Sequence, residues 1–349
     1  MARDLERRTA IPASPLKTRQ ESRPYWLSFL GGCFLALIFL EVVLHNLAGK
    51  TEGSFGIEQR SFTEGIAKSH FSPEGLRMTG NVRLTGASSL LLVGDSHVEA
   101  FQVQDEQTMG SILERRLRAD GKPYNVLQYG WSGADGPDYV FAAPLFKEHF
   151  PSNEIVFLMN AGDFASSSTT NAHLVARNDE VVAEASTAGS VRGRPPSFGD
   201  QRLRKVKESG LFYSIAVRFV LDLLPQLTEH KANVGERDLA ATGSSQETVH
   251  LIVRALKGAY GDKIFILYTP AQPFSQQTPP EAQEVALLSD CKVEGLECRS
   301  LRGRMIDDLL VRHKLARGFL NTAPGEGHLN ARGHELAAEE MYQWVNSSH

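Results

Sequence analysis

From residue 88 onward, short apolar runs alternate with segments whose apolar residues recur at helical spacing. The runs that predict buried strands are 88–96, 124–130, 154–160 and 263–270. The segments that predict helices are 106–119, 137–150, 246–260, 280–289, 300–313 and 331–345. This alternation predicts an α/β fold of three layers, in which helices cover both faces of a parallel sheet. Ligands of such sheets bind beyond the carboxyl ends of the strands, so the residues that follow each strand are the candidates for function.

Two segments depart from this alternation. Residues 165–245 are rich in Ser, Ala, Thr, Arg and Gly, and only 211–227 has the spacing of a good helix. We expect an insertion that partly caps the sheet, with a helix that either lines a cleft or covers the edge of the domain. Residues 48–87 mix Gly, Ser and Glu, and predict a linker leading into a domain that spans 88–349.

An apolar stretch near the N-terminus predicts a transmembrane anchor. Residues 25–47 are about as long as a helix that crosses ~30 Å of hydrocarbon, and only Glu41 and His45 interrupt them, late. Basic residues outnumber acidic ones in the tail 1–24, which is therefore expected in the cytoplasm, with the domain on the periplasmic side of the inner membrane. A cleaved signal peptide is the rival interpretation, although its apolar region is usually shorter and no A-x-A site follows Leu47.

Composition narrows the classes of function. The chain of 349 residues has a formal net charge of −4, which does not provide the positive excess that a nucleic-acid backbone requires. Its 3 cysteines exclude a cysteine-rich metal scaffold. Cys291 and Cys298 flank the short loop KVEGLE, and an oxidising compartment allows either a disulfide or two free thiols there. The sequence has no Walker A loop and no H-E-x-x-H zinc helix, so no cofactor or metal is expected.

Three strand ends and one C-terminal segment carry polar residues suited to acyl transfer. They are GDSH (94–97), GWSG (130–133), NAGDF (160–164) and GEGHLNARGH (325–334). A serine after a buried strand presents its hydroxyl at the sheet edge, and its own N–H can help to bind an oxyanion. A glycine in the next loop lets a second N–H come close, and an asparagine adds an amide donor. A histidine can act as the base where a carboxylate fixes its tautomer.

The order and placement of these segments resemble those of the SGNH hydrolases, the GDSL-like esterase and acyltransferase superfamily. The resemblance covers about 89–163 and 263–345, and it implies a flavodoxin-like three-layer fold. It implies Ser96 as the nucleophile and His328 as the base. It also implies an oxyanion hole formed by Ser96 together with Gly133 and Asn160.

Two segments differ from the family pattern. The third has N-A-G-D where G-x-N-D is common, so Asn160 precedes Asp163 by three positions. The fourth has Gly325 where the family motif D-x-x-H has its aspartate, which leaves Glu326 as the nearest carboxylate to orient His328.

Other polar residues of these segments have structural interpretations. Asp95 is expected to hold the serine loop through hydrogen bonds, and Ser96 itself can be interpreted as a simple helix cap. His97 is expected to point away from the site, and Asp163 and His334 to be structural.

The resemblance and the expected anchor together imply a membrane-bound serine esterase that removes acyl groups, above all acetyl, from a cell-envelope glycan or exopolysaccharide. One alternative is an O-acetyltransferase component, with a multi-span acyl-donor membrane protein as its partner. Another is a non-catalytic glycan-binding or scaffolding subunit of the same fold, favoured by the irregular third and fourth segments. Lipid esters are a further possibility if the helix expected at 211–227 lines a cleft.

Overall fold

The computed structural model describes most of the chain. The described residues are 25–48, 50–53, 56–61, 64–65, 67–72, 74–164, 172–177, 180–185, 245–320 and 322–347. The basic tail expected at 1–24 and the helix expected at 211–227 lie outside the described residues.

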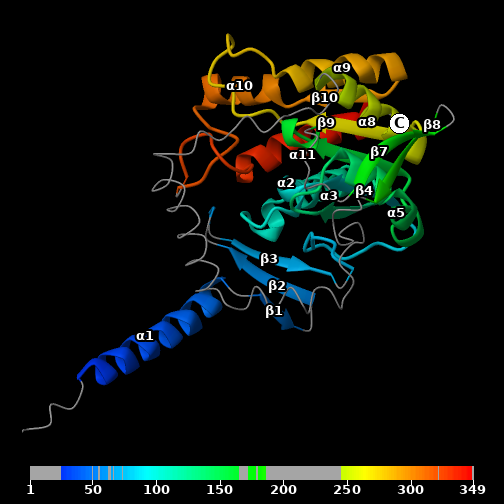
Figure 1. Cartoon of the computed structure of the whole chain (residues 1–349). Helices are drawn as coiled ribbons and strands as arrows, with labels where there is room; N and C mark the ends of the chain where they lie inside the picture. Colours follow the sequence, from blue (N-terminus) through cyan, green and yellow to red (C-terminus); the bar gives the residue numbers. More distant parts are fainter. Residues whose placement is uncertain are drawn as a thin grey trace, which may run out of the picture.

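A five-stranded parallel sheet forms the centre of the molecule (Figure 1). Its strands, in spatial order, are β10 (Glu297–Ser300), β9 (Ile264–Tyr268), β6 (Glu154–Met159), β4 (Ser88–Gly94) and β5 (Tyr124–Gly130). Each neighbouring pair runs parallel. The inner strands are apolar over nearly their whole length because helices cover both faces. The predicted α/β class with a parallel sheet is therefore confirmed.

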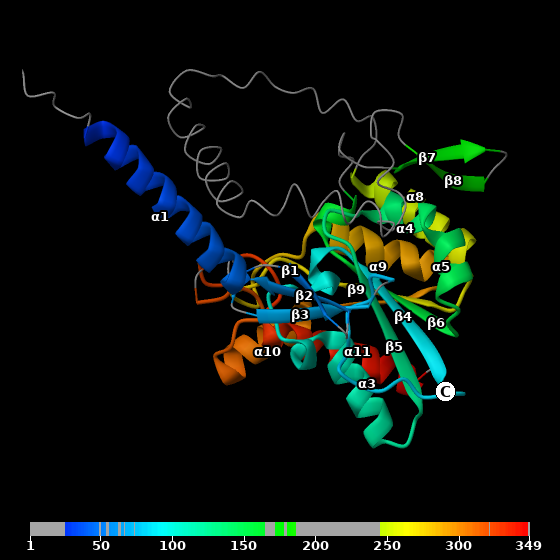
Figure 2. The ribbon, with the colours of Figure 1, turned by 90° about the horizontal axis from the view of Figure 1, so that it is seen from below.

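Two layers of helices enclose this sheet (Figure 2). One layer consists of α4 (Gly136–Phe141), α5 (Ala143–His149), α8 (Ser245–Tyr260) and α9 (Ala282–Glu294). The other consists of α2 (Ser96–Glu99), α3 (Met109–Ala119), α10 (Arg302–Arg312) and α11 (Ala331–Ser347). Successive residues of β4 alternate between the layers, since Leu91 packs in the first and Leu90 and Leu92 in the second.

Two expected elements differ in detail. The helix expected over 137–150 is divided into α4 and α5, because Pro144 has no N–H to donate to the carbonyl of Val140. Cys291 and Cys298, left open between a disulfide and two thiols, form a disulfide between the end of α9 and β10, with their Cα atoms 6.0 Å apart.

The strand order reverses at β4, and the region beyond the carboxyl ends of β4 and β6 is here called the crevice. β4 lies between β5, the next strand along the chain, and β6, the strand after that. The chain thus turns in opposite directions from β4, and ligands of open α/β sheets bind at such a point, beyond the carboxyl ends of the strands.

The segment 48–87 is not the linker that its composition predicts. It contains β1 (Lys50–Gly53), β2 (Gly56–Ser61) and β3 (Ala67–Phe71), which form an antiparallel sheet in that order. Figure 1 shows this N-terminal sheet below the main domain, with β3 as the strand that faces it. Its strands lack the long apolar runs of the central sheet, and β3 buries alternate residues, Ala67, Ser69 and Phe71.

The insertion at 165–245 contains a hairpin of β7 (Ala172–Arg177) and β8 (Glu180–Ala185). Figure 2 shows this hairpin beside α4 and α8, on one side of the main domain. Hairpin strands are the only elements described within the insertion, so its expected role as a cap stays a prediction.

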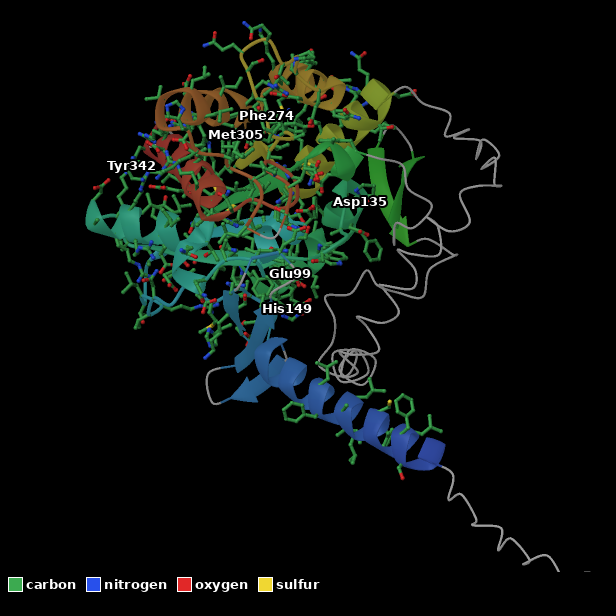
Figure 3. The ribbon with its side chains drawn as sticks, turned by 90° about the vertical axis from the view of Figure 1, so that its left-hand side faces the viewer. Glu99, Asp135, His149, Phe274, Met305 and Tyr342 are labelled. Carbon is green, nitrogen blue, oxygen red and sulfur yellow. A yellow bond between two sulfur atoms is a disulfide. The ribbon has the colours of Figure 1, made fainter. Side chains whose placement is uncertain are left out.

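Helix α1 (Tyr25–Ala48) extends away from the rest of the molecule (Figure 1). The side chains described along it, from residue 28 to residue 40, are exposed (Figure 3). They include Phe29, Phe34 and Phe39. Within the described residues, no helix is both long and apolar enough to span a bilayer. The anchor expected at 25–47 stays a prediction.

Candidate active site

The expected nucleophile lies where β4 meets α2. Ser96 is the first residue of α2, and the side chain of Asp95 caps this helix by accepting the N–H of His97 at 2.8 Å. Helix α2 packs closely against the end of β5, where Gly130 has no side chain to block it. A Cβ at Gly130 would come within 1.8 Å of the backbone nitrogen of Glu99. Ser96 is thereby held at the crevice, half-buried.

His328 lies next to this serine. It comes from the loop before α11, and its Nε2 is 2.8 Å from the Oγ of Ser96. The structure thus brings together the two residues that the sequence predicts as nucleophile and base, across 232 positions of the chain. This distance lies within the range in which a base can accept a proton from a hydroxyl.

The carboxylate beside His328 is Glu64, and the expectation of Glu326 in this place was wrong. Glu64 lies in the connection between β2 and β3, and its Oε2 is 2.6 Å from the Nδ1 of His328. The same oxygen accepts the backbone N–H of His328 at 3.0 Å. Glu326 is exposed instead, because it lies in a turn in which its N–H donates to the carbonyl of Ala323.

This contact assigns the protons of His328. A carboxylate at Nδ1 stabilises the tautomer with a proton on that nitrogen, which leaves Nε2 as the acceptor that faces Ser96. Gly327 allows Glu64 to come this close. It has a φ of +84°, and a Cβ there would come within 2.9 Å of the Glu64 carboxylate.

Asn160 follows β6 at the opposite side of the crevice. Its Nδ2 donates to Asp95 at 3.0 Å, and its Oδ1 accepts the N–H of Gly162 at 2.7 Å. Asp163 accepts the backbone N–H of Asn160 at 2.6 Å, so the unusual N-A-G-D spacing closes a turn around the asparagine. An amide nitrogen carries two hydrogens, and the bond to Asp95 uses one of them. Asn160 is therefore oriented beside the serine loop with an amide donor.

The loop after β5 carries Gly133, which has a φ of +79°. The loop is tied to the nucleophile region at two points. The N–H of Trp131 donates to the carbonyl of Gly94 at 3.0 Å, and both the N–H and the hydroxyl of Ser132 donate to the carboxylate of Glu99 (labelled in Figure 3). The loop is thus held beside α2, while an oxyanion contact from the Gly133 N–H stays a prediction.

The sequence predicts that His97 points away from the site, but in the structure its side chain faces His328. Its ring packs on that of His328 with the centroids 5.0 Å apart, and its Nδ1 accepts the N–H of Leu329 at 3.2 Å. Its Nε2 lies 3.2 Å from Nη1 of Arg317. Burial and the charge of Arg317 hold the pKa of His97 well below its usual value. The ring next to the expected base therefore stays neutral.

Three side chains hold successive backbone groups around the expected base. Arg317 donates to the carbonyl of Gly327 at 3.0 Å, Glu64 accepts the N–H of His328, and His97 accepts the N–H of Leu329. The loop that carries His328 is therefore fixed from several directions. Sequence reasoning missed Glu64 and Arg317, because neither lies in a segment that follows a strand of the central sheet or belongs to a family motif.

Two carboxyl groups around the crevice have raised pKa values. Burial raises the pKa of Asp95 and, more strongly, that of Asp163, which accepts the hydroxyl of Tyr139 at 2.6 Å. Burial also lowers the pKa of His334 to about 3, and its Nδ1 accepts the N–H of Met109 at 3.3 Å. Asp163 and His334 thus have the structural contacts that the sequence predicted for them.

Comparison with known proteins gives structural matches only. No family model matches the chain, and neither does any curated protein sequence. A two-domain esterase active on acetylated mannans is 9% identical, with a TM-score of 0.42 over 75% of this chain and 49% of that one. A catalytic mutant of Axe2, an acetylxylan esterase from Geobacillus stearothermophilus, is 11% identical, with a TM-score of 0.40 over 76% of this chain and 96% of that one. A member of the lipolytic G-D-S-L family from Veillonella parvula is 9% identical, with a TM-score of 0.36 over 74% and 97%.

The solved structures to which this chain is similar thus include esterases and a protein of the G-D-S-L family. The sequence motifs of the chain resemble the same family. The chain spans about half of the length of the mannan esterase. Because these TM-scores are low, the similarity shows nothing about activity.

Proposed function

We propose that this protein is an SGNH-type serine ester hydrolase in which Ser96, His328 and Glu64 form the catalytic triad. The observation that carries the proposal is the continuous hydrogen-bonded series from Glu64 through His328 to Ser96, with distances of 2.6 and 2.8 Å. A nucleophile, a base and a group that orients the base are the three parts that acyl transfer through serine requires.

The first half of the reaction forms an acyl-enzyme. His328 takes the hydroxyl proton of Ser96 on Nε2 while Oγ attacks the ester carbonyl, and Glu64 stabilises the resulting imidazolium through Nδ1. Negative charge develops on the former carbonyl oxygen, toward which the N–H groups of Ser96 and Gly133 and the amide of Asn160 would donate. The N–H of Ser96 is available because the first N–H groups of a helix have no intrahelical acceptor. The C–O bond then breaks, and His328 returns its proton to the leaving hydroxyl.

The second half regenerates the serine. Water loses a proton to Nε2 of His328 and attacks the acyl carbon, the oxyanion donors act again, and the bond to Oγ breaks as His328 gives the proton back. The products are a free acid and a free hydroxyl. Asp95 and His97 take no part in these proton transfers. Asp95 orients the loop, and His97 stays neutral beside a ring that must become charged.

The proposed substrates are acyl esters, above all acetyl esters, of a cell-envelope glycan or exopolysaccharide. Support comes from the proposed topology, in which α1 anchors the protein in the inner membrane with the main domain outside the cytoplasm. Exposed apolar side chains along α1 and an apolar sequence at 25–47 favour this anchor. The disulfide between Cys291 and Cys298 is also typical of an oxidising compartment.

Glu64 weakens the alternative of a non-catalytic glycan-binding subunit. That alternative depended on the missing carboxylate of the fourth segment, and Glu64 occupies the position beside His328 that this carboxylate would take. The O-acetyltransferase alternative uses the same acyl-enzyme and differs only in its acceptor, a sugar hydroxyl in place of water, with a multi-span donor protein as partner.

The test is labelling of the full-length chain, in detergent, with a fluorophosphonate that reacts with activated serines. We expect rapid labelling of the wild type that is lost in Ser96→Ala and His328→Ala. The activity of these variants on an acetyl ester should fall by a factor on the order of 10⁵ or more. Wild-type protein that is folded and unlabelled would contradict the proposal. If labelling is lost in Ser96→Ala, release of acetate from acetylated glycan, with and without added sugar acceptor, then separates hydrolase from transferase.

A further inference from the structure

The acid of the proposed triad is supplied by a hairpin outside the parallel sheet. β2 ends at Ser61 and β3 begins at Ala67, so Glu64 lies at the tip between them. The position of its carboxylate therefore depends on how β3 is held against the main domain. The following inference rests on the proposed function, since it concerns the activation of the same serine.

Side chains bind two N–H groups on the outer edge of β3, and the carbonyl of His70 on that edge accepts the backbone N–H of Met78 at 2.9 Å. β2 pairs with one edge of β3, and on the other edge the N–H of Lys68 donates to Oε1 of Gln104 at 3.2 Å. Two residues along, the N–H of His70 donates to Oδ1 of Asp105 at 3.0 Å. An edge strand normally presents such groups to solvent, so this pattern marks a specific docking contact.

Asp105 is the centre of this contact. Its second carboxylate oxygen bonds to Nδ1 of His70, and its Oδ1 also lies 3.0 Å from Nη2 of Arg77. The side chain of Arg77 is 0% exposed and donates to the carbonyl of Val103 at 2.8 Å. Burial lowers the pKa of Arg77 to about 10, so the group still carries its charge at neutral pH and Asp105 compensates it.

The tip itself packs against the same part of the main domain. Residues 101–105, here called the docking loop, follow α2 and so lie directly downstream of the nucleophile. Gly65, next to Glu64, has a φ of +74°, and a Cβ there would come within 2.7 Å of the carbonyl oxygen of Gln102 and of the Phe319 ring. Phe71 of β3 also packs on Phe101 of this loop, with ring centroids 5.2 Å apart. The docking loop thus follows Ser96 in the chain and contacts the hairpin that carries Glu64.

We propose that Asp105 is a positioning residue of the active site. By holding β3 against the docking loop it places Glu64 on His328, and it controls the activation of Ser96 without touching the substrate. Its effect on the reaction therefore passes through Glu64.

The first test is a double-mutant cycle with Glu64→Gln, measured as the rate of fluorophosphonate labelling of Ser96 in the full-length chain. We expect Asp105→Asn to slow labelling by about 10²-fold in the wild-type background, because a small misplacement of a catalytic group is that costly. In the Glu64→Gln background the same substitution should change the rate by less than about twofold, since the contribution that it disturbs is already absent. Equal factors in both backgrounds, or no effect in either, would overturn the proposal.

Two controls separate positioning from loss of structure. Glu284→Gln removes another buried carboxylate, whose partners Arg302 and Ser300 belong to α10 and β10 rather than to the hairpin or the docking loop, and it should leave the rate unchanged at a similar thermal stability. His70→Ala removes one partner of Asp105 while keeping the pair with Arg77. It leaves no buried charge uncompensated, and it should slow labelling by several-fold, again only when Glu64 is present.

A readout without activity distinguishes failure of this inference from failure of the proposed function. The proton shared by Nδ1 of His328 and Glu64 should give a proton NMR signal far downfield of the amide region. We expect the signal to disappear in Glu64→Gln, to weaken or shift in Asp105→Asn and to persist in Glu284→Gln. An unchanged signal in Asp105→Asn overturns the inference even if the wild type is active. If the signal changes in Asp105→Asn but the wild-type protein is not labelled, the inference is supported and the proposed esterase function is contradicted.

Discussion

The crevice at the ends of β4 and β6 and the tip of the β2–β3 hairpin both contribute to the site around His328, but they are built differently. The crevice takes its residues from the ends of parallel strands, where the topology of the sheet brings Ser96 and Asn160 together. The hairpin tip belongs to a separate antiparallel sheet, which is held by side-chain contacts to the docking loop and by a backbone hydrogen bond from Met78 to His70. In this molecule the topology of the sheet positions the proposed nucleophile and oxyanion donors, whereas the docking of the hairpin positions the proposed triad carboxylate, Glu64.

The largest expected effect tests which carboxylate orients His328. Glu64→Gln should reduce kcat/KM on an acetyl ester by about 10³–10⁴-fold, because an amide at Nδ1 neither stabilises the imidazolium nor enforces the productive tautomer. Its matched control, Glu326→Gln, changes an exposed side chain and should stay within about twofold. Steady-state kinetics measure both variants. A lower kcat/KM in Glu326→Gln than in Glu64→Gln would show that Glu326, and not Glu64, orients His328.

The crevice can be tested at Asn160. Asn160→Ala removes the amide donor and should lower kcat by about 10²–10³-fold with little change in KM, since the contact acts on charge that develops in the transition state. The bond to Asp95 is also lost, so thermal unfolding should accompany the kinetics. A change confined to KM would mean that Asn160 binds the ground state and lies outside the oxyanion hole.

A smaller effect is expected at His97, which joins the two regions. His97→Asn keeps an acceptor where Nδ1 receives the N–H of Leu329, whereas His97→Phe removes it. We expect His97→Phe to lower kcat by about tenfold and His97→Asn by less, because the loop that carries His328 is held at three successive residues. A larger loss in His97→Asn than in His97→Phe would show that the ring matters for its bulk alone.

The smallest effect on activity, together with an effect on stability, is expected at Asp135, which caps α4 beside the crevice. Burial raises its pKa to about 8, against about 3.9 in an unfolded chain. Between these values the folded state keeps a proton that the unfolded state releases, so the free energy of unfolding falls as pH rises from about 4 to 8. At pH 7 the loss has a ceiling of about 4 kcal/mol, from about three pH units at 1.36 kcal/mol each.

The substitution Asp135→Asn keeps the helix cap and removes this titration. Denaturant unfolding of the variant at several pH values should therefore give a flatter profile and a higher stability at pH 7, with activity unchanged. A wild-type stability that rises from pH 4 to pH 8, with the same slope in the variant, would contradict the assignment.

Sequence reasoning succeeded where local pattern and topology act together. The apolar runs that became β4, β5, β6 and β9 are visible in the sequence, and residues after parallel strands must meet at one edge. It failed for Glu64, which lies 264 positions from His328 in a segment of mixed composition and follows no motif spacing. The one available signal was negative, because a missing carboxylate before His328 implies that another part of the chain supplies it. His97 was misjudged because neighbouring residues along a short helix can still face the same site.

Helix α1 is separated from β1 by a single residue, and β1 and β2 lead directly to the tip that carries Glu64. The carboxylate beside His328 is therefore encoded before the first strand of the parallel sheet, since Glu64 precedes β4 in the chain. A fragment that begins at β4 would keep Ser96, Asn160 and His328 and would lack the third member of the proposed triad. The proposed active site thus extends beyond the parallel-sheet domain into the segment that joins it to α1.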